Sequence, residues 1–117
     1  QGYGLKELVN DKSSWVRAAV ARQGFGLDIL IHDESESVRV AVAEQGYGLD
    51  VLINDSEVGV RCAVAQQGYR WDILARDKNP TVRANVAEQG GELELLVKDK
   101  SSIVRNIAKE MLKKANN

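Results

Sequence analysis

The stretch QGFGLDILIHDESESVRVAVAE, residues 23–44, decides the fold, because the chain repeats this pattern five times. The copies start at Gln1, Gln23, Gln45, Gln67 and Gln89. A unit this small cannot bury its own apolar face, so it has to stack on neighbouring copies of itself. The sequence therefore predicts an extended array with a long surface, and not a globule built around a pocket.

The second half of each copy predicts a helix of about ten residues. Val38, Ala41 and Val42 follow the i, i+3, i+4 spacing of a buried helical face. The alternation of valines at 38, 40 and 42 would also suit a strand. The other copies lack valine at the position of Val40 and keep the helical stripe, so a helix is the better interpretation.

Cap residues and glycines set the expected helix ends. Pro80 suits the first turn of a helix, which places the N-cap one residue before it. The expected N-caps are Ser13, Ser35, Asn79 and Ser101. The Gly that follows each Gln is the expected stop. In the first half of the copy, residues 26–31 predict a shorter helix of about two turns, with Leu27, Leu30 and Ile31 on one face.

The run of Asp, a short polar stretch and Val-Arg-x-x-Val/Ala-Ala resembles the second helix of HEAT repeats and of the leucine-rich repeat variant. The residues and this resemblance together imply an all-α, right-handed α-solenoid of five two-helix repeats in one domain over residues 1–117. The repeats are 1–22, 23–44, 45–66, 67–88 and 89–110, and 111–117 extends a C-terminal capping helix. The variant family can carry a cysteine-ligated iron–sulfur cluster, but with Cys62 as the single cysteine no cofactor is expected here.

Asp at the eleventh position and Arg at the seventeenth are the same in every copy. The two sets are Asp11, Asp33, Asp55, Asp77 and Asp99, and Arg17, Arg39, Arg61, Arg83 and Arg105. The resemblance implies that each loop Asp meets an Arg of a neighbouring helix. We therefore interpret these charged residues as structural and not as a catalytic set.

The last copy departs from the pattern, because its apolar stripe runs past the place where Gln-Gly should end the helix. The stripe is Val104, Ile107, Ala108, Met111 and Leu112. We expect a longer amphipathic helix there whose polar side closes the stack. The first copy has no such cap before Gln1, which suggests a cut end.

A strip opposite the buried stripe of the second helices is the first candidate binding site. Its residues are Trp15, Arg22, Glu36, Ser37, Val40, Glu44, Cys62, Gln66, Thr81 and Glu88. The strip is mainly acidic and would repel a phosphate backbone, so it suits a basic or mixed peptide, with Trp15 as an aromatic anchor. The alternative is that the glutamates are ordinary solvated surface and that Trp15 packs on a missing repeat.

The loop edge between the helices is the second candidate, for a nucleic acid or another polyanion. Its residues are Lys12, Arg76, Lys78, Lys98 and Lys100. Helix N-termini open at this edge and favour anions. Glu34 and Ser56 interrupt it in the middle copies, so nucleic acid ranks behind a protein partner.

Other classes of function find less support. The net charge of −1 does not point to nucleic acid or membrane, and no apolar run reaches the length of a membrane span. The lone His32 is expected at the surface, and Trp71 in the core. No nucleophile–base pair, metal site or phosphate loop stands out, so we expect no enzyme activity and no metal. A cytoplasmic scaffold is the default expectation, and a structural spacer is a further alternative.

Overall fold

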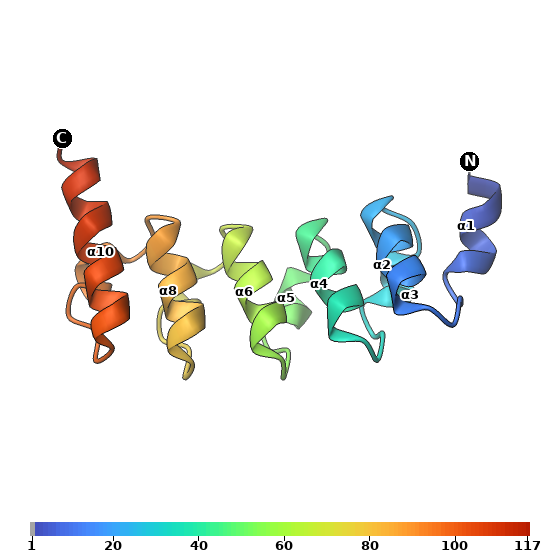
Figure 1. Ribbon diagram of the computed structural model, residues 1–117, viewed down its shortest axis with the longest axis horizontal. Coiled ribbons are helices and arrows are strands. Elements are labelled where there is room, and N and C mark those ends of the chain that lie inside the picture. Colours follow the sequence, from blue (N-terminus) through green and yellow to red (C-terminus); the bar gives the residue numbers. More distant parts are fainter. Residues whose placement is uncertain (1) are drawn as a thin grey trace. The chain divides into compact units, whose positions relative to one another are not determined.

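The computed structural model describes residues 2–117, with side chains from Gly4 onward, and Figure 1 shows its ribbon. Over this range the chain consists of helices and turns without strands, which confirms the expected all-α class. The chain divides into two compact units, the first up to Gln67 and the second from Gly68 to Asn117.

The first unit alternates short and longer helices. They are α1 (Gly2–Leu8), α2 (Ser14–Arg22), α3 (Leu27–Leu30), α4 (Glu36–Glu44), α5 (Leu49–Leu52) and α6 (Val58–Gln66). The longer helices α2, α4 and α6 lie side by side, α2 packing on α4 and α4 on α6 (Figure 1). The one-turn helices α3 and α5 each pack against the longer helix before and after them.

The second unit continues the alternation. Its helices are α7 (Trp71–Leu74), α8 (Pro80–Glu88), α9 (Leu93–Leu96) and α10 (Ser102–Ala115). Helix α8 packs on α10, and α9 contacts both. The expected longer helix at the end of the chain is confirmed, since α10 has 14 residues. Its stripe buries Val104 and Ala108, while Lys109 and Lys113 on the opposite side are exposed.

The longer helices begin and end as the sequence predicts. Their N-caps include Ser13, Ser35, Asn79 and Ser101. Only two of these side chains cap a backbone amide: Asn79 accepts from the N–H of Thr81 at 2.8 Å and Ser101 from that of Val104 at 3.4 Å. After α2, α4 and α8 the glycine stop is confirmed, with φ of 78°, 75° and 86° at Gly24, Gly46 and Gly90.

The expected two-turn helix in the first half of each copy is confirmed in the first copy, where α1 has seven residues. In the other copies it is wrong in length, because α3, α5, α7 and α9 have four residues each. Gly26 lies in the left-handed region at φ 66° and so stands outside α3. Its missing side chain also matters, since a Cβ there would lie 2.7 Å from Cγ2 of Val9. The left-handed residue and the close approach of the previous loop leave room for one turn only.

The predicted helical stripe forms the core. Val38, Val42, Val60 and Val64 are fully buried in the first unit, together with Leu30 and Leu52 of the short helices. The second unit buries the equivalent residues. They are Leu74, Val82, Val86, Leu96 and Val104. Complete burial of such a side chain contributes about 1.5–3 kcal/mol, so these residues are the main source of stability in each unit.

Candidate functional site

Three arginines at the seventeenth repeat position, Arg17, Arg39 and Arg83, each hold two successive loops together. Arg17 donates from Nε and Nη2 to the carboxylate of Asp33, at 2.8 and 3.1 Å, and from Nη1 to the carbonyl oxygen of Asp11 at 2.8 Å. The same arrangement joins Arg39 to Asp55 and Arg83 to Asp99. These side chains are between 5% and 14% exposed. Buried, fully bonded pairs of this kind are structural, as the repeat pattern indicates.

The carboxylates of these pairs also order the loop that they belong to. Asp33 accepts from the N–H of Ser35 at 2.8 Å, and Asp99 from that of Ser101 at 2.9 Å. Burial alone would raise the pKa of Asp33, but the hydrogen bonds and charge of Arg17 outweigh it and hold the pKa below its ordinary value. The same balance, with Arg83 as the partner, lowers the pKa of Asp99. Both groups are ionised at neutral pH and engaged, which leaves them no role as proton donors.

A groove between α2 and α4 brings together part of the predicted strip. One end is a recess of about 280 Å³ and the other a recess of about 460 Å³, and Arg22 and Ser37 line both. We call this the α2–α4 groove; its residues are Trp15, Ala18, Arg22, Ser35, Glu36, Ser37 and Val40. Glu44 adjoins it, with its carboxylate 4.0 Å from Nε of Arg22. The groove thus offers a wall with both charges and a floor of short apolar side chains.

Trp15 stands at the edge of the groove with 86% of its surface exposed. On its other side lies an apolar recess of about 500 Å³, lined by Leu5, Leu8, Val16 and Ala19 among others. Sequence reasoning missed this recess. Leu8 is 36% exposed, whereas its counterpart Leu30 is buried at 1%. Both residues occupy the same position of the repeat, so the sequence pattern alone cannot show that one is exposed and the other buried.

Glu36 reaches from α4 across to α6. A Cβ at position 59 would lie 2.5 Å from Oε2 of Glu36, so the carboxylate occupies space that the side chains of other copies would take. The equivalent residues are Trp15, Ser37, Thr81 and Ile103. Gly59 is the one residue without a side chain at this repeat position, so the sequence already indicated that this copy leaves space there.

The expected exposure of Cys62 is wrong, because the structure buries its thiol. Helix α6 buries every residue from Val60 to Ala65. Ala18, at the equivalent position of α2, is buried at 4% exposure. Of the remaining strip residues, Gln66 is exposed on α6, and Thr81 and Glu88 are exposed on α8 in the second unit. Fewer residues of the predicted strip are therefore exposed than expected, and those that line a groove lie in the first unit.

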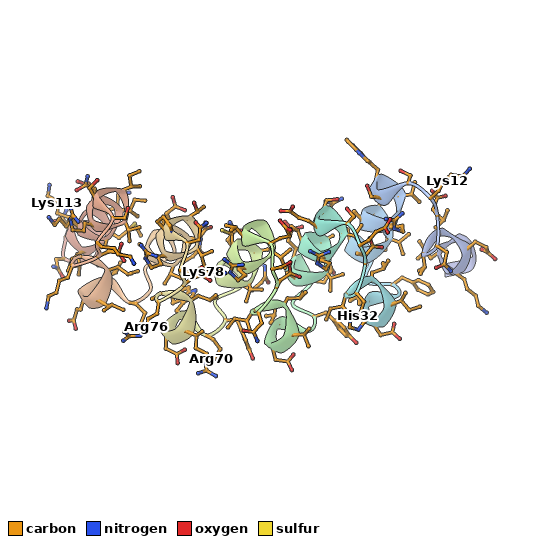
Figure 2. The ribbon with its side chains drawn as sticks, turned by 90° about the horizontal axis from the view of Figure 1, so that it is seen from below. Lys12, His32, Arg70, Arg76, Lys78 and Lys113 are labelled. Atoms are coloured by element: carbon orange, nitrogen blue, oxygen red, sulfur yellow. The ribbon has the colours of Figure 1, made fainter. Side chains whose placement is uncertain are left out.

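Four residues of the predicted basic edge line one cleft of about 300 Å³ in the second unit. They are Arg76, Lys78, Lys98 and Lys100. Figure 2 shows Arg76 and Lys78 in this unit, and Lys113 apart from them on the α10 side. Lys12 lies elsewhere, in a groove of the first unit that it shares with His32 and Glu34. His32 is exposed, as expected.

Across residues 2–117, no helix combines the length and apolar character needed to cross a lipid bilayer. The same residues contain no cluster of three or more His, Cys, Asp or Glu arranged to bind a metal ion.

Comparison with known proteins gives no relative, since no protein-family model, no curated protein and no solved structure matches the chain.

Proposed function

We propose that the chain is a right-handed α-solenoid of five HEAT-like or leucine-rich-variant repeats that serves as a non-catalytic protein-interaction scaffold. The repeat of Asp and Arg, the sequential helix contacts and the arginine pairs inside each unit support the architecture. Arrays of this kind usually act through their extended surfaces, which favours binding over catalysis.

The exposed ring of Trp15 beside the α2–α4 groove is the observation that carries this function. A Trp with 86% exposure contributes little to the fold, yet Trp is the residue most enriched among energetic anchors of interfaces. The equivalent positions in most other copies hold small or polar residues, so the repeat does not require an aromatic residue there.

The groove suits an extended peptide segment with an apolar side chain against Trp15 and a basic side chain toward the glutamates. Ala18 and Val40 form an apolar floor. The charged groups of the groove are the guanidinium of Arg22, the carboxylate of Glu44 at 4.0 Å from its Nε, and the carboxylate of Glu36, which reaches toward α6. The formal charge of these three groups is −1, which favours a basic over an acidic peptide.

Selection from a random peptide library displayed on phage tests this proposal. We expect enriched peptides that combine an apolar and a basic residue, and at least a tenfold loss of their affinity on Trp15→Ala and on Glu44→Lys. The matched controls are Ile103→Ala and Glu110→Lys, which remove an exposed apolar side chain and reverse a charge in the second unit. Both controls should keep the affinity of the unmodified chain.

Two results would overturn the proposal. If no peptide is enriched, the groove is solvated surface and a spacer role becomes the better explanation. If the control variants lose as much affinity as the groove variants, the peptides bind elsewhere. Circular dichroism of each variant would separate a lost site from a lost fold.

A further inference from the structure

The basic cleft of the second unit carries an inference that is independent of the α2–α4 groove. Arg76 and Lys78 come from the loop before α8, and Lys98 and Lys100 from the loop before α10. Each loop contributes its tenth and twelfth repeat positions, so the cations form two pairs on neighbouring loops. Packed helices are about 8–10 Å apart, which sets the approximate separation of the two pairs.

The four cations lack close partners in the described part of the chain, although the charge of Lys100 helps to lower the pKa of Asp99. Over residues 2–117, Arg76, Lys78, Lys98 and Lys100 have no ion pair and no side-chain hydrogen bond, and all four are exposed. Their charge is therefore available to a ligand.

The carboxylates of the cleft are already bonded. Asp99 accepts from Arg83 at 2.9 and 3.1 Å and from the N–H of Ser101. Asp77 accepts from the N–H of Asn79, and its carbonyl oxygen from Nη1 of Arg83 at 2.7 Å. Five basic side chains against these two carboxylates give the cleft a formal charge of +3.

The equivalent groove of the first unit shows that the repeat does not impose this charge. That groove lies between the loops of Asp11 and Asp33. It contains two basic side chains, Lys12 and Arg17, and three carboxylates with Glu34, so its formal charge is −1 with His32 neutral. The same backbone arrangement thus carries a positive net charge in one unit and a negative net charge in the other. The repeat fold therefore does not require the cations of the second cleft, and stability does not explain them.

We propose that this cleft binds an anion with two or more adjacent phosphate groups. Two pairs of cations on neighbouring loops match charges that are spread over several ångströms better than a single phosphate, and unpaired Lys and Arg bind phosphates strongly. No aromatic side chain lines the cleft, so nothing there would stack on a base. The chemistry recognised is the phosphate chain itself, whether free or as part of a nucleic-acid backbone.

Isothermal titration of the full chain with inorganic triphosphate at low salt tests the inference. We expect saturable binding that weakens with added salt. Lys98→Gln with Lys100→Gln should weaken it at least tenfold. The matched control, Lys113→Gln with Lys114→Gln, removes two exposed lysines of the same unit outside the cleft and should leave the affinity unchanged.

Three outcomes would overturn the inference: no heat of binding at millimolar triphosphate, equal loss of affinity in the cleft and control variants, or orthophosphate that binds as tightly as triphosphate. A single-stranded oligothymidylate, titrated in parallel, distinguishes the sources. Tighter binding of the oligonucleotide with the same sensitivity to Lys98→Gln and Lys100→Gln would support a nucleic-acid backbone, and weaker binding a free polyphosphate.

Discussion

The indole ring of Trp71 lies against the backbone of Gly91, so close that a Cβ at position 91 would lie 2.5 Å from Cδ2 of the ring. The other copies have Leu where Trp71 stands and an aromatic residue where Gly91 stands. The fourth copy therefore carries an additional aromatic ring, and the fifth copy lacks the aromatic residue of the repeat. The expectation that Trp71 is a core residue needs this correction: its ring is half-buried and fills the space left by the missing aromatic.

This exchange predicts strong coupling between the two positions. Trp71→Leu should lower the free energy of unfolding by about 1–3 kcal/mol through a cavity, and Gly91→Tyr by a similar amount through overcrowding. The double variant restores the arrangement of the other copies and should lose at least 1 kcal/mol less than the sum, as urea unfolding would measure. Additive losses would mean that the two residues do not share this space.

The arginine pairs predict a graded series of stabilities. Arg83→Ala leaves the buried carboxylate of Asp99 without its partner and should cost about 3–5 kcal/mol. Arg105→Ala is the matched control, because Arg105 bonds the carbonyl of Asp99 at 2.8 Å and has no ion pair among the described residues. Its loss should be about 1–2 kcal/mol. Equal losses in urea unfolding would show that the carbonyl bond, and not the ion pair, supplies the stability.

The depressed pKa values of Asp33 and Asp99 predict acid sensitivity. Their folded pKa lies below the unfolded value of about 3.9, so their contribution to stability is present above about pH 4. It is lost as the pH falls through the folded pKa. Thermal unfolding followed by circular dichroism should give a melting temperature that falls steeply below pH 4. Asp33→Asn should flatten that fall, whereas the exposed control Asp28→Asn should not.

The left-handed residue before the short helices predicts a stabilising substitution. Gly26 and Gly48 adopt this conformation without strain, but Glu92 adopts it at φ 50° with a side chain. Glu92→Gly should therefore raise the free energy of unfolding by about 1 kcal/mol. Glu92→Ala removes the carboxylate but keeps the strain, so it serves as the control and should give no such gain. A destabilised Glu92→Gly variant would contradict the assignment of strain.

The parts of the fold that sequence reasoning predicted are those that every copy repeats. The buried valines and the glycine stops recur in register, so comparison of the copies separates them from variable residues. The cap residues recur in all the longer helices except α6, whose N-cap is Glu57. The pairing of Asp with Arg was expected from the resemblance to HEAT-like repeats, which rests on residues that every copy contains.

What the sequence could not supply depends on neighbouring helices. Helical spacing places Cys62 and Ala18 opposite the buried stripe, yet both residues are buried, at 9% and 4% exposure. Each one-turn helix begins only after a residue in the left-handed region, which is Gly26, Gly48, Arg70 or Glu92, and that conformation leaves no trace in periodicity. The basic cleft was predicted as a set of residues, but its closure into one cavity in the second unit required the structure.

The reach of each arginine also fixes how such a chain can change in length. Arg17 contacts its own loop six residues back and the next loop sixteen residues ahead, and the two spans together equal one full copy. Excision of residues 23–44 would bring Asp55 to the position that Asp33 now holds, with every donor still matched to an acceptor. A deletion one residue shorter would misplace the carboxylate by one position. This pattern of hydrogen bonds therefore tolerates the insertion or deletion of whole copies, and no other change in length.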